Sequence, residues 1–533
     1  MSRESKLIVF VALLASLLEI IDASIVNVAI PSMMGNLGAT LEDISMVVTG
    51  YAIANAIVLP VSAWLGGRFG RRQYYLGCIA LFTITSVACG LAPNLPTLIV
   101  FRIFQGLAGG ALLPTSQALI YEQFPKEKAG MAGALFGMSV MVGPTLGPVV
   151  GGYLTDEFGW RSIFNINLPL GILALFLGYV AIKNVVQPKP EVIKQEGVVQ
   201  DVVAEGPPAK APIDGWGLLL VAVGIGSLQY VLERGEADDW FSSNAVLICS
   251  MLAAVCLPLF VWWELRIKHP IMNLRLFKDP IVANGVLLMT MVGFFLYAVV
   301  FILPIFISST LHYDATQTGL LFMPGALVTI VMMPMVGKAM QKFDARILVA
   351  IGFAGITAAA LTFAQLSTDA GSKEILHGLY IRGFAMAFLF VPINSSILSQ
   401  FKGMELGQVS GLLNLSRQIG GGIGIALVGT LLTMNSHQNY VDISSKVSML
   451  DAPTQQAVQQ LQGGMGAKMQ NQVGAATPNQ ATMKILSGRI QGQVFMLSFN
   501  QLMYTIAFVC LLGFIPLARI RFRNRPVAIA DSH

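Results

Sequence analysis

The feature that most constrains this chain is the recurrence of long apolar segments along it. About 20 mostly apolar residues form a helix long enough to cross the hydrocarbon core of a bilayer. Fourteen such segments lie near residues 7–31, 44–66, 74–93, 97–121, 130–155, 163–183, 214–234, 244–265, 281–307, 317–340, 346–366, 375–400, 405–433 and 494–518. We therefore expect an all-α integral membrane protein with 14 transmembrane helices.

The scarcity of charged residues excludes several classes of protein. Of the 533 residues, 11% are charged, whereas soluble globular proteins average about 25%. So few charges cannot cover a water-exposed surface, which excludes a soluble enzyme, a nucleic-acid-binding protein and a disordered scaffold. The first apolar segment is too long for a signal peptide and carries acids near its middle, so we expect it to be retained as the first helix.

The lysines and arginines predict the orientation of the helices, because cytoplasmic loops of membrane proteins carry an excess of both. With the N-terminus inside, 23 of the 33 lie in inside segments and 7 in outside segments. The other three, Arg102, Arg382 and Arg417, lie within spans. Both termini are therefore expected in the cytoplasm.

An internal repeat divides the chain. A basic hairpin, an intramembrane arginine and a glycine-rich segment each occur twice, at 66–72 and 337–346, at Arg102 and Arg382, and at 143–152 and 420–424. We expect two six-helix halves joined by a linker and a two-helix insert. The expected boundaries are 1–183 for the first half, 184–213 for the cytoplasmic linker, 214–265 for the inserted helices and 266–533 for the second half. Repeated halves that rock about a midplane site are typical of transporters.

Two acids, Glu19 and Asp22, lie deep within the first span and share one helix face at spacing i, i+3. Burying an ionised side chain at this depth costs roughly 2.5–3.5 kcal/mol, so such acids indicate function. Paired carboxyl groups in this setting are candidates for taking up and releasing protons. Arg102 is the matching buried cation. The alternative is structural: an acid held in a fixed ion pair with Arg102 or with another helix.

Other candidates are weaker. Arg382 and Arg417 are possible second-half counterparts of the buried charges, although Arg417 is equally suited to capping backbone carbonyls. Glycines and prolines in the fifth span remove bulk and backbone hydrogen bonds, which favours close helix contact and a conformational role. These residues are Gly143, Pro144, Gly147, Pro148, Gly151 and Gly152.

Two further groups have a plain alternative. Arg68, Gly70, Arg71 and Arg72 form either a cytoplasmic gate or a cluster that merely obeys the charge bias of inside loops. Aromatic and methionine side chains suit an adaptable substrate pocket, but most such residues face lipid or core. The candidates are Phe294, Phe295, Tyr297, Phe301 and Met323.

Cofactor chemistry has no support in the sequence. The five cysteines lie inside apolar runs without a CxxC pair, which favours small core side chains. Metal-ligand spacing and nucleotide-binding motifs do not occur, and no histidine lies deep in a span. We therefore expect no cofactor, no metal site and no enzyme activity, and we expect an ion gradient or the substrate itself to supply the energy.

Four segments resemble the major facilitator superfamily, in particular its fourteen-span drug:proton antiporter branch of the EmrB/QacA type. They are 21–31 (IDASIVNVAIP), 143–152 (GPTLGPVVGG), 160–171 (WRSIFNINLPLG) and 414–424 (NLSRQIGGGIG). The resemblance covers nearly the whole chain. One departure is Gly67, which stands where the superfamily usually has Asp, so the usual charged gate there is in doubt.

The resemblance implies a proton-coupled multidrug exporter in a bacterial inner membrane. It would move amphipathic or hydrophobic compounds out of the cytoplasm or inner leaflet by alternating access, with Asp22 and Arg102 in proton transfer. The family signature does not require an acid at Glu19. The alternatives are a dedicated exporter of one metabolite, fatty acid or siderophore, and a non-transporting membrane sensor or assembly subunit.

A long segment, 434–493, separates the last two spans and is rich in Gln, Asn, Met and Gly. By the predicted topology it is a periplasmic loop, with a short helix expected at 453–461. Such a loop resembles those of exporters that pass substrate to a periplasmic adaptor and an outer-membrane channel. The alternative is a loosely ordered loop without a partner.

Overall fold

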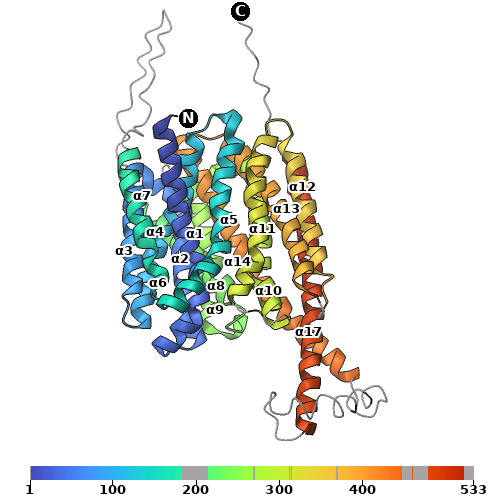
Figure 1. The fold of residues 1–533 in the computed structure, drawn as a ribbon. Helices are drawn as coiled ribbons and strands as arrows, with labels where there is room; N and C mark the ends of the chain where they lie inside the picture. The colour runs from blue at the N-terminus through green and yellow to red at the C-terminus, as the bar shows by residue number, and fades with distance from the viewer. Residues whose placement is uncertain are drawn as a thin grey trace, which may run out of the picture.

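The fold is a bundle of long helices (Figure 1). A computed structural model describes residues 2–182, 214–267, 270–310, 313, 315–367, 370–446, 456, 459 and 478–520. The first half contains α1 (Arg3–Leu37), α2 (Leu41–Phe69), α3 (Arg71–Gly90), α4 (Leu95–Glu122), α5 (Ala129–Phe158), α6 (Ser162–Asn165) and α7 (Asn167–Ala181). The inserted pair is α8 (Gly215–Arg234) and α9 (Asn244–Arg266). The second half contains α10 (Pro280–Thr310), α11 (Ala315–Ala339), α12 (Ala345–Phe363), α13 (Ser372–Leu398), α14 (Gly403–Lys446), α17 (Pro478–Leu511) and α18 (Phe514–Arg519).

The number of membrane-crossing helices agrees with the sequence. Among the described residues, 14 helical segments are long and apolar enough to span a bilayer, with α6 and α7 forming one span and α17 and α18 another. The predicted all-α fold with 14 spans is confirmed. The linker 184–213 lies outside the described residues, and the boundaries between the predicted units stay predictions.

The internal repeat reappears in the way the helices pack. In the first half α1 packs on α5 and α2 packs on α4; in the second half α10 packs on α14 and α11 packs on α13. The two halves meet where α5 contacts α11 and α13, and where α14 contacts α2 and α4. The inserted helix α8 packs against α2 of the first half and α14 of the second, with α9 outside it.

Polar residues mark where several of these apolar helices begin. Thr40, Asn94 and Asp214 each accept a hydrogen bond from a backbone N–H in the first turn of α2, α4 and α8, which satisfies a donor that the helix itself leaves free. Within the spans, helical pairing satisfies backbone groups inside each helix, as lipid requires, except where an internal proline such as Pro31, Pro60 or Pro114 lacks the N–H. The sequence can therefore be apolar on all sides without exposing unpaired backbone.

The two glycine-rich segments have equivalent places in the two halves. Gly143, Gly147 and Gly151 face Ile20, Ser24 and Ile25 of α1, and a Cβ at any of them would collide with that helix. Their second-half counterparts on α14 are Gly420 and Gly424, which face the backbone of α10 at Thr290 and Phe294. Small residues let helix backbones approach closely in membranes. The repeat thus conserves one close helix contact per half.

The segment 434–493 differs from its expected form. Helix α14 continues to Lys446 and α17 begins at Pro478, so both ends of the predicted loop are helical. At 1.5 Å per residue, the 44 residues of α14 extend about 66 Å, roughly twice the bilayer core. Asn439 donates to Ser498 Oγ (2.9 Å) and to Gln501 Oε1 (3.1 Å), which holds the two extensions together. Most of 447–477 lies outside the described residues; of the expected helix at 453–461, Gln456 and Gln459 are described and are helical.

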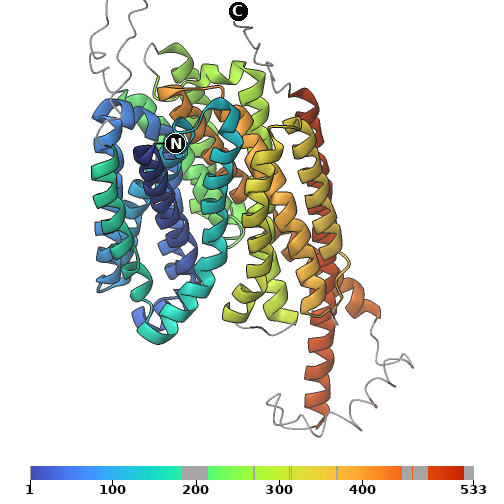
Figure 2. The ribbon, with the colours of Figure 1, turned by 45° about the horizontal axis from the view of Figure 1, so that its top comes forward.

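The two ends of the bundle are therefore different. We call the face at which α1 begins and α18 ends the terminal face. We call the opposite face the loop face; α14 and α17 project beyond it (Figures 1 and 2).

Candidate functional site

A cavity of about 670 Å³ lies between the two halves. Its walls come from α1, α2, α4 and α5 of the first half, α10, α11 and α14 of the second half, and the inserted helix α8. Most of the lining is apolar, with three charged side chains, Glu19, Glu233 and Arg417. A large apolar cavity with a few polar groups is the usual form of a small-molecule site.

A polar network closes the bundle between this cavity and the terminal face. Gln117 of α4 donates to Asn394 Oδ1 of α13 (2.8 Å) and accepts hydrogen bonds from Ser410 and Asn414 of α14. All four side chains are buried. A buried network is stable because each partner would be costly to leave unpaired. The halves are therefore joined on this side of the cavity.

Close backbone contacts continue this closure toward the terminal face. Tyr121 and Ser395 share a hydrogen bond of 3.1 Å, and Ser395 Oγ donates to the carbonyl of Ala129 (3.1 Å). Gly130 of α5 and Gly337 of α11 lie so near each other that a Cβ on either would meet the other's backbone. The cavity lining instead extends toward the loop face, for example along α10 from residue 296 to residue 308. The structure is closed on the terminal face.

Glu19 is the acid of α1 that faces the cavity. Asn55 of α2 donates to its Oε1 (2.9 Å), while Oε2 is buried without a hydrogen-bond partner among the described residues. The cation with which it interacts electrostatically is Arg417 of α14, from the other half. A carboxyl group with a free oxygen, facing a cavity, can exchange one ligand for another.

Asp22 has different surroundings, although it lies one turn further along α1. Its Oδ2 forms an ion pair with Arg102 Nη1 (2.6 Å). Its Oδ1 accepts hydrogen bonds from Gln105 (2.9 Å) and Asn167 (2.7 Å). Asp22 and Arg102 are fully buried, and neither lines the cavity. The sequence left open whether Asp22 is a proton-coupling acid or an acid held in an ion pair with Arg102 or another helix; the structure brings Asp22 and Arg102 together.

Arg102 is held by three further contacts. Its Nε donates to the carbonyl of Val47 (3.2 Å), its Nη1 donates to Gln105 (2.9 Å), and its guanidinium lies 4.0 Å from the centre of the Tyr51 ring. Tyr51 also lines the cavity. This ring therefore lies between the buried ion pair and the cavity.

Comparison with known proteins decides the family. A model of the family described as "Major Facilitator Superfamily" matches residues 12–425. The chain belongs to the major facilitator superfamily. The predicted resemblance is confirmed, and the protein is a transporter of small molecules rather than an enzyme.

Individual relatives agree with this assignment. The chain is 31% identical to "Fatty acid resistance protein FarB" of Neisseria gonorrhoeae over 96% of this chain and 95% of the relative. It is also 31% identical to "Multidrug export protein EmrB" of Escherichia coli (strain K12), over 96% and 94%. The human organic anion transporter MFSD10 shares the fold, with a TM-score of 0.54, 12% identity, and coverage of 96% of this chain and 100% of that structure.

The second-half arginines of this superfamily member lie in two different places. Arg417 lines the cavity, where its guanidinium donates weakly to the Tyr297 hydroxyl (3.4 Å) and to Asn414 Oδ1 (3.3 Å). The ion pairs of the described residues do not include it. Arg382, on α13, lies outside the cavity lining. Of these two arginines, Arg417 is the one that lines the cavity.

The predicted pocket residues are divided in the same way. Tyr297 and Phe301 line the cavity. Phe294 and Phe295 pack into the core, and Phe322 lines the cavity where Met323 was expected. The reason is the helical period: successive residues point about 100° apart, so a run of several consecutive side chains cannot all face the cavity.

Two of the predicted conformational residues lie at or beside the cavity. Pro148 lines it, and Gly152 faces Thr316 of α11, the opposite half; Pro144 lies within α5, and its side chain is outside the described part. The gate residues lie at the terminal face. Arg71 pairs with Glu122 (2.6 Å), and Arg72 donates to the carbonyl of Tyr179 (3.2 Å).

Two more gate positions complete this turn. Gly70 has φ 86°, a left-handed conformation that suits glycine. Gly67, which replaces the usual Asp, faces the Met404 side chain at the start of α14. At this position an apolar contact between the halves takes the place of a charged one. Arg68, at the end of α2, precedes this turn.

Sequence reasoning missed several polar residues of the cavity. Asn55, Gln229 and Glu233 all line it. Asn55 and Gln229 look like isolated polar residues in apolar spans, and Glu233 lies at the end of its span, where an acid needs no explanation. The available signal was the i, i+4 spacing of Gln229 and Glu233, which places both on one face of α8.

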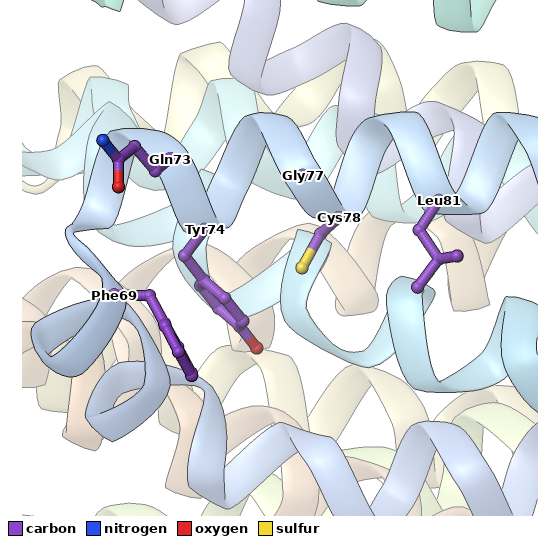
Figure 3. A pocket seen from close by; sticks show the side chains of 6 residues that line it. All are labelled: Phe69, Gln73, Tyr74, Gly77, Cys78 and Leu81. Carbon is purple, nitrogen blue, oxygen red and sulfur yellow. The ribbon is translucent and has the colours of Figure 1, made fainter.

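A second hollow lies on the surface of α3 near the terminal face (Figure 3). It measures about 340 Å³ and is open on one side, with Tyr74, Cys78 and Leu81 along α3 and Phe69 at the end of α2. Its lining carries no charged group. It is therefore a groove in the outer wall of the bundle rather than part of the central site.

Proposed function

We propose that this protein is a proton-coupled exporter of amphipathic or hydrophobic compounds, working by alternating access. The observation that carries the proposal is a cavity between two repeated halves, closed toward the terminal face, with the partly unpartnered carboxyl group of Glu19 in its wall. The names of the relatives EmrB and FarB support export of drug-like and fatty-acid-like compounds. The apolar lining suits both.

In this mechanism the terminal face is cytoplasmic and the loop face is outside, in a bacterial inner membrane. The conformation described above then opens outward. Glu19 takes up a proton from outside, and the network around Gln117 opens when the halves rock. The proton leaves toward the cytoplasm, and substrate occupies the cavity in its place. No cofactor is needed, because the proton gradient supplies the energy.

The buried pair of Asp22 and Arg102 contributes to coupling by its position. Asp22 lies one turn from Glu19 on α1, and Arg102 stacks on Tyr51, which lines the same cavity. Movement of α1 against α4 changes the distance between the two charges. Since an unpaired buried acid favours its protonated form far more than a paired one, Asp22 binds a proton when the pair separates.

A second candidate function is the dedicated export of one class of compound, fatty acids. Two observations favour it: the relative named as a fatty acid resistance protein, and Arg417, a cation in the cavity without an ion pair among the described residues. A carboxylate headgroup would bind Arg417 while its chain lies along the apolar wall.

The extensions of α14 and α17 are the proposed contact for a periplasmic adaptor that leads to an outer-membrane channel. They project beyond the loop face (Figure 2) and are joined at Asn439. A tagged protein lacking 440–485, which removes the ends of both extensions, should lose co-purification of the adaptor while it still folds. Retention of the adaptor by this deletion would contradict the proposed contact.

The exporter is tested by reconstitution into liposomes with an imposed pH gradient. We expect gradient-driven substrate flux and substrate-dependent proton movement in the native protein. Glu19→Gln and Asp22→Asn should each abolish uphill flux. Exchange of substrate at zero gradient should survive in Glu19→Gln. If neither substrate drives protons nor a gradient drives substrate, the antiport mechanism fails; native proton stoichiometry in Asp22→Asn would exclude Asp22 from coupling.

A further inference from the structure

The inserted helix α8 contributes acidic and amide side chains to the central cavity. Gln229 and Glu233 both line it, and Gln229 Nε2 donates to Glu233 Oε1 (2.8 Å). Gln229 is 3% exposed, and its Oε1 has no hydrogen-bond partner among the described residues. A buried acceptor without a donor is costly unless a ligand or water supplies one.

The charge of Glu233 is not balanced by its neighbours. The following residue, Arg234, is directed elsewhere: it pairs with Asp238 (2.6 Å) and Glu42 (3.8 Å) and donates to Ser45. Among the ion pairs of the described residues, none includes Glu233. The carboxylate is half-buried, so its field is less screened than that of a surface acid.

The position of Glu233 places it near the loop face. Thr49 of α2 lies beside its carboxyl group, whereas Asn55 of α2 binds Glu19. Six residues separate Thr49 and Asn55, which corresponds to about 9 Å along the helix. The two carboxyl groups therefore occupy successive levels of one cavity, with Glu233 nearer the loop face.

We propose that Glu233 and Gln229 form a second subsite, which binds positively charged amphipathic compounds at the loop-face end of the cavity. This rests on the proposed export function and adds a substrate class to it. Glu233 supplies the negative charge, Gln229 Oε1 supplies an acceptor for an N–H of the ligand, and Phe301 and Phe322 supply apolar surface in the same wall. Desolvated carboxylates bind organic cations in this way.

The subsite also explains what the inserted pair adds to the two repeated halves. Helix α8 packs on α2 and on α14, and Leu232 contacts α14 at Gly422. Because α2 and α14 belong to opposite halves, rocking of the halves alters the space around Glu233. A cation bound there is released as this space changes.

The test is direct binding of two cations by the purified full-length protein without a gradient. Ethidium carries N–H donors, and tetraphenylphosphonium carries none. We expect Glu233→Gln to weaken the binding of both by about tenfold or more, and Glu233→Asp to retain most of it. Gln229→Leu should weaken ethidium binding more than tetraphenylphosphonium binding. Glu127→Gln, which removes an exposed acid outside the cavity, is the matched control.

Several outcomes would overturn the proposal. The proposal fails if the native protein binds neither cation, or if Glu233→Gln binds both cations as well as the native protein does. It also fails if Glu233→Asp and Glu233→Gln lose the same amount of binding while their melting temperatures stay unchanged. If Glu233→Gln does not fold, the two-ligand comparison in Gln229→Leu decides. Because binding is measured without a gradient, failure of this subsite is distinct from failure of gradient-driven export in liposomes.

Discussion

Glu19 and Asp22 lie one turn apart on α1 and face different surroundings. Glu19 faces the central cavity with one carboxylate oxygen free of hydrogen bonds among the described residues. Asp22 is fully enclosed and paired with Arg102 at 2.6 Å. The spacing i, i+3 turns the second acid by about 60° around the helix, which is enough to move it from the cavity wall into the contact with α4. Removing each charge should therefore have different consequences.

Asp22→Asn should destabilise the protein by about 3–5 kcal/mol, because it leaves Arg102 buried without its counter-charge. Glu19→Gln should change stability little. The double variant with Asp22→Asn and Arg102→Gln should recover much of the loss. Thermal melting of the purified protein in one detergent measures all four forms. Equal melting temperatures for the native protein and Asp22→Asn would contradict a stabilising ion pair.

The Ala63–Gly407 contact should report the conformation of the two halves. Cysteines at both positions should form a disulfide under mild oxidation, because a Cβ at Gly407 of α14 would lie 3.2 Å from the Cβ of Ala63 of α2, across the halves. The cross-link should stop transport, and reduction should restore it. With a protease site inserted in 184–213, cross-linked halves migrate together on a non-reducing gel. The single-cysteine variants control for the native cysteines, and free transport in the cross-linked form would refute this gate.

Gln117→Ala should favour opening of the terminal face. The change leaves Asn394, Ser410 and Asn414 without a shared partner, at a cost of about 1–3 kcal/mol to the closed form. The yield of the 63–407 disulfide should fall in this background. The control is Gln400→Ala. Gln400 is an exposed amide just after α13, and its side chain donates to the carbonyl of Ser396 near the end of that same helix. An unchanged yield would show that the network does not hold the closed state.

Phe301→Ala and Phe295→Ala should separate substrate recognition from stability. Phe301 lines the cavity, so its loss should raise KM for apolar substrates with a small change in melting temperature. Phe295 is 1% exposed and packs in the core, so its loss should cost about 3–5 kcal/mol while KM stays near the native value. Flux assays and thermal melts are the measurements. The opposite pattern would move the substrate site away from this cavity.

The residues of the site show how far sequence reasoning reaches. The buried charges at Glu19, Asp22 and Arg102 could be found because charge inside an apolar span is rare and costly. Glu233 escaped notice because it lies at the end of its span, where acids are ordinary. The sequence also did not show that Tyr297 lines the cavity and Phe295 does not, because both residues lie on one helix that is apolar on all sides.

The sequence by itself determined the number of spans, the repeat and the family, because the bilayer sets the length and polarity of each helix independently of its neighbours. Tertiary structure alone decided which faces of those helices meet. It paired Asp22 with Arg102, left Glu19 in the cavity and brought Glu233 of the inserted helix into the same wall. A helix that is apolar all round carries no pattern that distinguishes lipid from a neighbouring helix, so these contacts depend on close packing between segments far apart in the chain.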